Sequence, residues 1–165
     1  MRFVLVLHGE TAANDASLTE TGRRQAQAVG AQLRGQAATV ISSPSPSAIE
    51  AATIIAAAAG AAQPEARREM DAPENEAARA SAQEDAWAII EAAKTELDPD
   101  ATLVMVTHEV NIRLLVARAL AMPLSEMDRF ALEPGSMSTI EWRTQPRERL
   151  LIASLNEVCH LEASS

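Results

Sequence analysis

The chain has 165 residues, a length that suits a single domain spanning residues 1–165 with one hydrophobic core. Its net charge is −9 and aromatic residues make up only 2% of it, so nucleic acids and acidic membrane surfaces are unfavourable partners. The only cysteine, Cys159, has no partner for an internal disulfide, which fits a reducing, cytoplasmic location. The longest apolar stretches are too short for a membrane span.

The first half of the chain alternates strand and helix patterns. Residues 2–7 (RFVLVL) predict a buried strand that ends abruptly at His8 and Gly9. A helix is expected from Thr19 or Thr21 to about residue 34, because either threonine can cap it and a glycine follows its end. The next elements are a strand at 38–42, a helix at 47–59 that stops at a glycine, and a polar loop at 63–76.

The second half continues this alternation. Residues 102–107 (TLVMVT) are the strongest strand pattern in the chain, and His108 follows them directly. The other expected elements are a long helix at about 74–97, a helix at about 110–121, and strands at 137–142 and 149–155.

This order predicts a three-layer α/β/α sandwich with a mostly parallel central sheet. Ligands of such sheets bind beyond the carboxyl ends of the strands. His8 and His108 each follow a strand, so we expect both imidazoles at the same edge and in one pocket.

Several motifs give the chain a family resemblance. Residues 5–11 (LVLHGET) with Asn14 resemble the "RHGETxxN" signature of the phosphoglycerate-mutase-like branch of the histidine phosphatase superfamily. Further matches follow in the expected order: residues 18–26 (LTETGRRQA), residues 41–52 around Ser42-Ser43-Pro44, residues 106–108 (VTH), residues 135–138 (GSMS) and residues 155–161. The resemblance spans nearly the whole chain and implies a phosphoglycerate-mutase-like fold.

The resemblance also implies catalytic roles. The first histidine of the family accepts the phosphoryl group and the second stabilises it, which would be His8 and His108 here. A carboxylate is the general acid. Glu69 is the best match to that position, and Asp71, Glu74 and Glu76 are alternatives.

This sequence departs from the family at both phosphate-binding arginines. Leu7 stands directly before His8, and Ser47 occupies the second arginine position. Phosphoryl transfer depends on positioning and on charge stabilisation, for which the guanidinium group is well suited. The two replacements therefore predict a strong loss of ordinary phosphatase activity.

Other charged residues bear on this prediction. Arg113, Arg67 and Arg68 are the arginines that could act as substitutes. Glu109 replaces a residue that is commonly glycine in the family, and it would bring negative charge towards the pocket.

The remaining expectations concern ligands. Contacts to a small-molecule ligand are predicted for Leu7, Gly9, Glu10, Thr11, Asn14, Ser47 and Glu109. Two histidines 100 residues apart, with no carboxylate at a ligand spacing, give no support for a metal site, and no cofactor is expected. A homodimer is left open.

Three functions are compatible with these residues. The first is a repurposed enzyme in which His8, His108 and Glu69 form an acid/base set for a small molecule that is not a simple phosphomonoester. The second is a phosphatase or mutase of low activity that forms a phosphohistidine at His8. The third is a non-catalytic binding or regulatory protein on the same scaffold.

Overall fold

The computed structural model describes residues 1–12, 17–36 and 39–162. Their strands form one six-stranded sheet in the order β3-β2-β4-β1-β5-β6. The strands are β1 (Arg2–Leu7), β2 (Thr39–Ser42), β3 (Glu65–Ala66), β4 (Thr102–Thr107), β5 (Met137–Arg143) and β6 (Arg149–Glu157).

Most neighbouring strands of the sheet are parallel. The pairs β1/β4, β2/β4 and β2/β3 are parallel, whereas β5 runs antiparallel to both β1 and β6. The helices are α1 (Glu20–Gln32), α2 (Pro46–Ala59), α3 (Arg79–Glu96), α4 (Glu109–Ala119) and the short α5 (Cys159–Glu162). The predicted mostly parallel sandwich is therefore confirmed.

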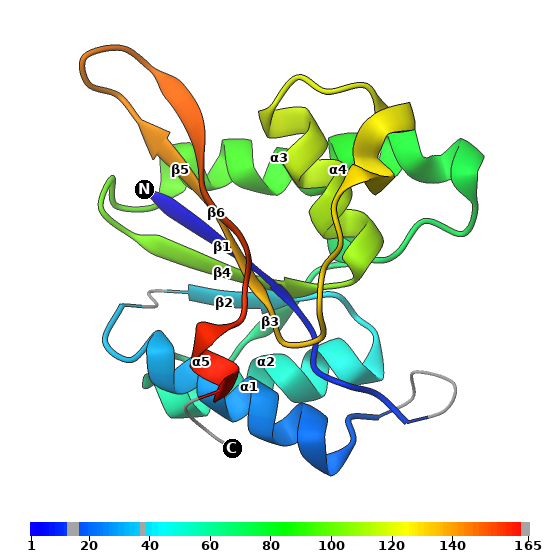
Figure 1. The fold of residues 1–165 in the computed structure, drawn as a ribbon. Helices are drawn as coiled ribbons and strands as arrows, with labels where there is room; N and C mark the ends of the chain where they lie inside the picture. Colours follow the sequence, from blue (N-terminus) through cyan, green and yellow to red (C-terminus); the bar gives the residue numbers. More distant parts are fainter. Residues whose placement is uncertain (13–16, 37–38, 163–165) are drawn as a thin grey trace.

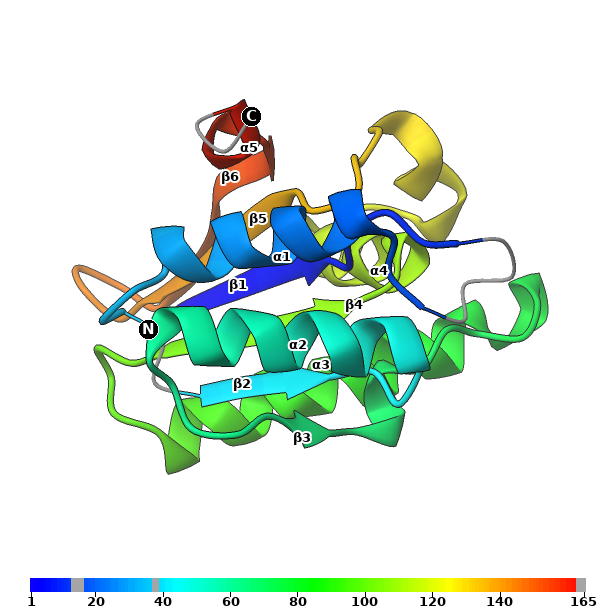
Figure 2. The same cartoon turned by 90° about the horizontal axis from the view of Figure 1, so that it is seen from below.

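Helices cover both faces of the sheet, as Figures 1 and 2 show. Alternate residues of β1 divide between the two cores. Val4 and Val6 pack with α1 and α2, where many of the contacts come from alanine. Phe3 and Leu5 pack with larger side chains of α3 and α4 on the opposite face. None of the helices among the described residues combines the length and apolar character that a membrane crossing needs.

The helix ends on the α1/α2 face follow from local capping. Thr19 caps α1 by accepting a hydrogen bond from the Gly22 amide, and Ser45 caps α2 by accepting one from the Ala48 amide. Gly60 ends α2 in the left-handed conformation, at φ 75°.

The segment between α2 and α3 differs from the sequence expectation. The predicted loop at 63–76 contains β3 and a 3₁₀ turn, η1 (Arg68–Met70). The helix expected from residue 74 begins only at Arg79, after a second turn, η2 (Glu76–Ala78). The Asn75 side chain accepts a hydrogen bond from the Ala78 amide, and this local bond competes with a longer helix.

Candidate active site

Strand register places His8 and His108 side by side. Leu7 of β1 is paired with Thr107 of β4, so the next residue on each strand is a histidine at the same edge of the sheet. The His8 amide donates to the Thr107 carbonyl oxygen at 3.2 Å. The centroids of the two imidazole rings lie 5.2 Å apart and the ring planes are at 82°. The sheet thus brings together the two histidines predicted to share a pocket.

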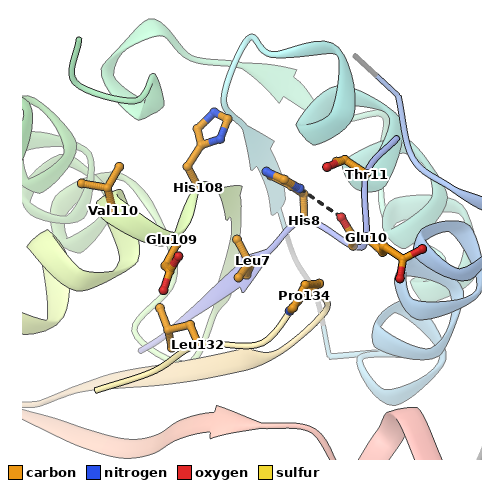
Figure 3. A pocket seen from close by; sticks show the side chains of 10 residues that line it. Leu7, His8, Glu10, Thr11, His108, Glu109, Val110, Leu132 and Pro134 are labelled. Carbon is orange, nitrogen blue, oxygen red and sulfur yellow. Dashed lines mark hydrogen bonds between the residues drawn. The ribbon is translucent and has the colours of Figure 1, made fainter. Parts of the chain in front are cut away.

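The His8 ring is held by its own loop. Its Nδ1 lies 3.1 Å from the Gly9 carbonyl oxygen. Because a carbonyl oxygen only accepts, this bond requires a proton on Nδ1, and in the neutral ring the lone pair is then on Nε2. Figure 3 shows that this second nitrogen lies on the side of the ring that faces His108. The arrangement suits Nε2 to act as a base or nucleophile.

His108 is held by Ser43, a residue that was not among the predicted site residues. The Ser43 Oγ lies 3.0 Å from His108 Nε2 and also accepts a hydrogen bond from the Ser45 amide. The Ser43 amide donates to Val106 on the neighbouring strand, two residues before His108. Ser43 belongs to the Ser-Ser-Pro motif, but its contact with His108 depends on the pairing of β2 with β4.

A cavity of about 520 Å³ opens beside the two histidines. Most of the predicted ligand contacts line it, namely Leu7, Gly9, Glu10, Thr11 and Glu109, together with His8 and His108. Val110, Leu132 and Pro134 also line it, although no sequence motif points to them. Asn14 lies outside the described residues. The volume is in the range of small-molecule sites.

Ser47 is placed apart from this cavity. It is fully buried near the start of α2, its Oγ lies 3.5 Å from the Ser45 Oγ, and it is not one of the lining residues. The replacement of arginine by serine here leaves a short side chain packed inside the protein. A ligand contact for Ser47 stays a prediction.

None of the three arginines considered as substitutes is among the residues that line the cavity. Arg113 pairs with Glu109 at 2.6 Å and with Asp128 at 2.7 Å. Arg67 pairs with Glu69 at 3.2 Å and lines a different cavity, between β2 and α3. Arg68 is exposed. Among the described residues that line the histidine cavity there is no arginine or lysine.

Glu69 lies in η1, and its side chain does not line the histidine cavity. The backbone of this turn is close to the end of β4, because Thr107 donates to the Met70 carbonyl oxygen at 2.8 Å. The Glu69 carboxylate instead bonds to its own backbone amide and to Arg67, and both contacts lower its pKa below the usual value. The carboxylate is therefore ionised at neutral pH. Its role as general acid stays a prediction, as do those of the exposed alternatives Asp71, Glu74 and Glu76.

The loop after His8 is fixed against α1. Its close approach requires glycine on both sides, because a Cβ on Gly9 would lie 2.5 Å from the Gly22 carbonyl oxygen. The Glu10 amide donates to the Gln25 side chain at 2.8 Å, and the Thr19 hydroxyl donates to the Glu10 carboxylate at 2.7 Å. These contacts place Glu10 at the cavity.

Glu50 of α2 secures the far end of the same loop. Its carboxylate accepts a hydrogen bond from the Leu18 amide at 3.0 Å and pairs with Arg23 of α1 at 2.6 Å. The amide bond is the largest cause of a lowered Glu50 pKa, and Arg23 adds to it.

Within the described part of the chain, no three His, Cys, Asp or Glu residues are grouped so that they could hold a metal ion.

A parallel sheet that presents two histidines at its carboxyl edge, between two layers of helices, defines a class of α/β proteins with a His-based site. Solved structures share this fold. YhfR of Bacillus stearothermophilus has a TM-score of 0.81 and 20% identity, with 97% of this chain and 98% of that chain covered. Phosphoserine phosphatase of Entamoeba histolytica, in complex with 3-phosphoglyceric acid, has a TM-score of 0.78 and 20% identity over 97% and 98% of the two chains.

A mycobacterial glucosyl-3-phosphoglycerate phosphatase, in complex with VO3, gives a TM-score of 0.78 and 19% identity over 95% of this chain and 99% of that one. A search of curated proteins gives no significant match. The sequence matches the profile of the histidine phosphatase superfamily (branch 1) over residues 3–87 and 61–154. The chain belongs to this superfamily, and the predicted resemblance is confirmed.

Proposed function

We propose that this protein is a repurposed histidine phosphatase homologue, in which His8 and His108 act as an acid/base pair on a small molecule that is not a simple phosphomonoester. The observation that carries this proposal is a combination of two features. The two imidazoles are adjacent, with ring centroids 5.2 Å apart, and the described residues that line the cavity include no arginine or lysine. Imidazole exchanges protons near neutral pH without needing either arginine.

The cost of losing the arginines supports this choice. Each charged hydrogen bond to the transferred phosphoryl group contributes roughly 1.5–3 kcal/mol. At about 1.4 kcal/mol per tenfold change in rate, removing two such groups would slow phosphoryl transfer by two to four orders of magnitude, or by more where each group makes two bonds. A proton transfer between imidazole and a neutral carbon or heteroatom acid is not slowed in this way, because no phosphoryl group has to be stabilised.

The cavity itself supports chemistry over a purely structural role. Leu7 and Glu109 line the space beside the histidines and leave about 520 Å³ open, enough for a small molecule. His8 and His108 are both partly exposed to this space. His8 Nδ1 is oriented by its hydrogen bond to the Gly9 carbonyl oxygen, and His108 Nε2 by its hydrogen bond with the Ser43 hydroxyl.

Phosphoryl transfer through a phosphohistidine at His8 is the second candidate. It is favoured by the Nε2 lone pair that the Gly9 contact leaves on His8, and by the fold shared with a phosphoserine phosphatase and a glucosyl-3-phosphoglycerate phosphatase. In this alternative an arginine from outside the cavity lining would have to reach the phosphate.

The test compares wild type, His8→Ala and the double variant Leu7→Arg/Ser47→Arg with para-nitrophenyl phosphate and a panel of phosphorylated metabolites. We expect no turnover by wild type and turnover by the double variant that is lost when His8→Ala is added to it. Hydrolysis by wild type that His8→Ala abolishes would contradict the proposal and favour the second candidate. The thermal midpoint of each variant is measured first, because the larger arginine side chain at the buried position 47 can destabilise the fold.

A second experiment tests the acid/base role directly. Wild type and His8→Ala are incubated in D₂O with a mixture of small metabolites without phosphate groups, and mass spectrometry records deuterium that enters non-exchangeable C–H positions. We expect incorporation that requires His8. A mixture in which wild type and His8→Ala give the same pattern would count against proton transfer as the activity.

A further inference from the structure

We propose that the cavity at His8 and His108 binds an organic ammonium ion, that is, an amine that carries an apolar group. This inference rests on the proposed function and names the ligand class of the same site. It is based on the charges that line the cavity, on the residues that neutralise them, and on the apolar part of the lining.

The charged groups of the lining, other than the histidines, are both carboxylates. Glu10 is exposed and Glu109 is about half exposed at 46%, and both line the cavity. The Glu10 carboxylate is oriented by the Thr19 hydroxyl at 2.7 Å, a neutral partner that leaves its negative charge uncompensated. Figure 3 shows this carboxylate directed away from the two imidazoles, on the side of α1, so it contributes a negative charge beside the cavity and not a direct contact at the histidines. The described residues offer it no lysine or arginine partner.

Glu109 has a cationic neighbour, but that cation serves two carboxylates. Arg113 pairs with Glu109 at 2.6 Å and with Asp128 at 2.7 Å, and its side chain is only 20% exposed. The three groups carry one positive and two negative charges, so this side of the cavity is also negative. An anionic ligand would meet repulsion here, because Arg113 already has both partners.

Apolar side chains form the other part of the lining. Leu7 and Leu132 are 6% and 8% exposed, and Val110 and Pro134 complete this part. Figure 3 shows Leu7, Leu132 and Pro134 on one side of the two imidazole rings. A hydrocarbon group can be buried against them, while an ammonium group is attracted by the negative charges of Glu109 and Glu10. Leu7 occupies the place of a family arginine, so one replacement both removes a positive charge and adds apolar surface.

The experiment uses three probes of the same shape and different charge: benzylamine, benzyl alcohol and benzyl phosphate. Binding to the full chain is followed at about pH 7.5 and low salt by the imidazole NMR signals of His8 and His108. We expect benzylamine to shift both signals with the highest affinity, benzyl alcohol to bind more weakly, and benzyl phosphate to give no saturable shift. Added salt is expected to weaken benzylamine binding, because the attraction is screened.

Charge variants test the source of the preference. Glu10→Gln and Glu109→Gln are each expected to lower benzylamine affinity about two- to fivefold, the range for a solvent-exposed ion pair. Glu84→Gln is the matched control, because Glu84 pairs with Arg118 between α3 and α4 and does not line the cavity. It removes the same charge and an ion pair and should leave the affinity unchanged.

The wild-type comparison decides the proposal even if a variant is unstable. Benzyl alcohol or benzyl phosphate binding as tightly as benzylamine would overturn it, and so would no binding by any of the three probes. An equal loss of affinity in Glu84→Gln would also overturn it. The proposed acid/base activity is judged separately, by His8-dependent deuterium incorporation. If amines bind but no His8-dependent incorporation is found, the activity is refuted and the proposed ligand class is still supported.

Discussion

The Ser43 Oγ lies 3.0 Å from His108 Nε2, and it joins two segments of chain that are far apart in sequence. Ser43 is fully buried and its amide is bonded to Val106, so the hydroxyl is a fixed partner for the imidazole. Ser45 donates its amide to the same hydroxyl oxygen at 3.2 Å. This leaves the Ser43 hydroxyl proton available for Nε2, and the neutral His108 ring would then carry its own proton on Nδ1. Ser43 is therefore a positioning residue for His108.

Replacing Ser43 with alanine should release the His108 ring. The change removes the contact to Nε2 and leaves the Ser45 amide without its acceptor, at a cost of about 1–2 kcal/mol in the free energy of unfolding. Nitrogen chemical shifts of His108 should move towards those of a mixture of tautomers, and urea unfolding measures the stability. Ser81→Ala, at an exposed position on α3, is the control. Unchanged His108 nitrogen shifts would show that the ring is oriented by other contacts.

Gly22→Ala should disturb the loop that carries Glu10. A Cβ at this position would overlap the Glu10 carbonyl oxygen, which is backbone and moves only if the loop moves. We expect a loss of about 1–3 kcal/mol in the free energy of unfolding, typical of overpacking, and altered His8 imidazole signals. Gly60→Ala is the comparison, because a Cβ there meets nothing within 4 Å and only the left-handed backbone is strained, at about 1–2 kcal/mol. Normal His8 signals in Gly22→Ala would mean that the loop adapts without moving the site.

Glu50→Gln should destabilise the protein in a pH-dependent way. The pKa of Glu50 is lowered in the folded state by the Leu18 amide and by Arg23, so the ionised carboxylate favours folding. This contribution is present above the unfolded-state pKa, near the reference value of 4.5, and is lost as pH falls through the lower folded-state pKa. We expect a loss of about 1–2 kcal/mol at pH 7 and little difference between variant and wild type at the acidic end of this range. Urea unfolding at a series of pH values measures it, and a constant difference at all pH values would rule out the ionised carboxylate as the cause.

Glu69→Gln should have a small effect on any His8-dependent turnover, about twofold or less. Its carboxylate is bonded to Arg67, its pKa is lowered, and its side chain is not part of the cavity lining, so it is poorly suited to donate a proton to a ligand there. The measurement is the initial rate of Glu69→Gln beside wild type on the substrate found by deuterium incorporation. A loss of a hundredfold or more would show that η1 rearranges when ligand binds and that Glu69 is the acid predicted from the sequence.

The sequence alone determined the fold class and the two histidines of the site. Strands at 2–7 and 102–107 have strong apolar patterns and end at a histidine, and their bounds in the structure are those predicted. The parallel arrangement of these strands follows from the alternation of strands and helices, and it places His8 and His108 at the same edge of the sheet. Local signals of this kind are readable because strand burial and helix capping act over a few neighbouring residues.

Only the tertiary structure decided which other side chains reach that edge. Ser43 contacts His108 because β2 is paired with β4, and Leu132 and Pro134 join the cavity from the segment before β5. The ion pairs of Arg113 with Glu109 and Asp128, and of Arg67 with Glu69, are likewise not specified by any sequence pattern. Such contacts depend on how distant segments pack and on which charged side chains the fold brings close together. A one-dimensional pattern does not contain that information, so the character of the cavity emerged only from the folded chain.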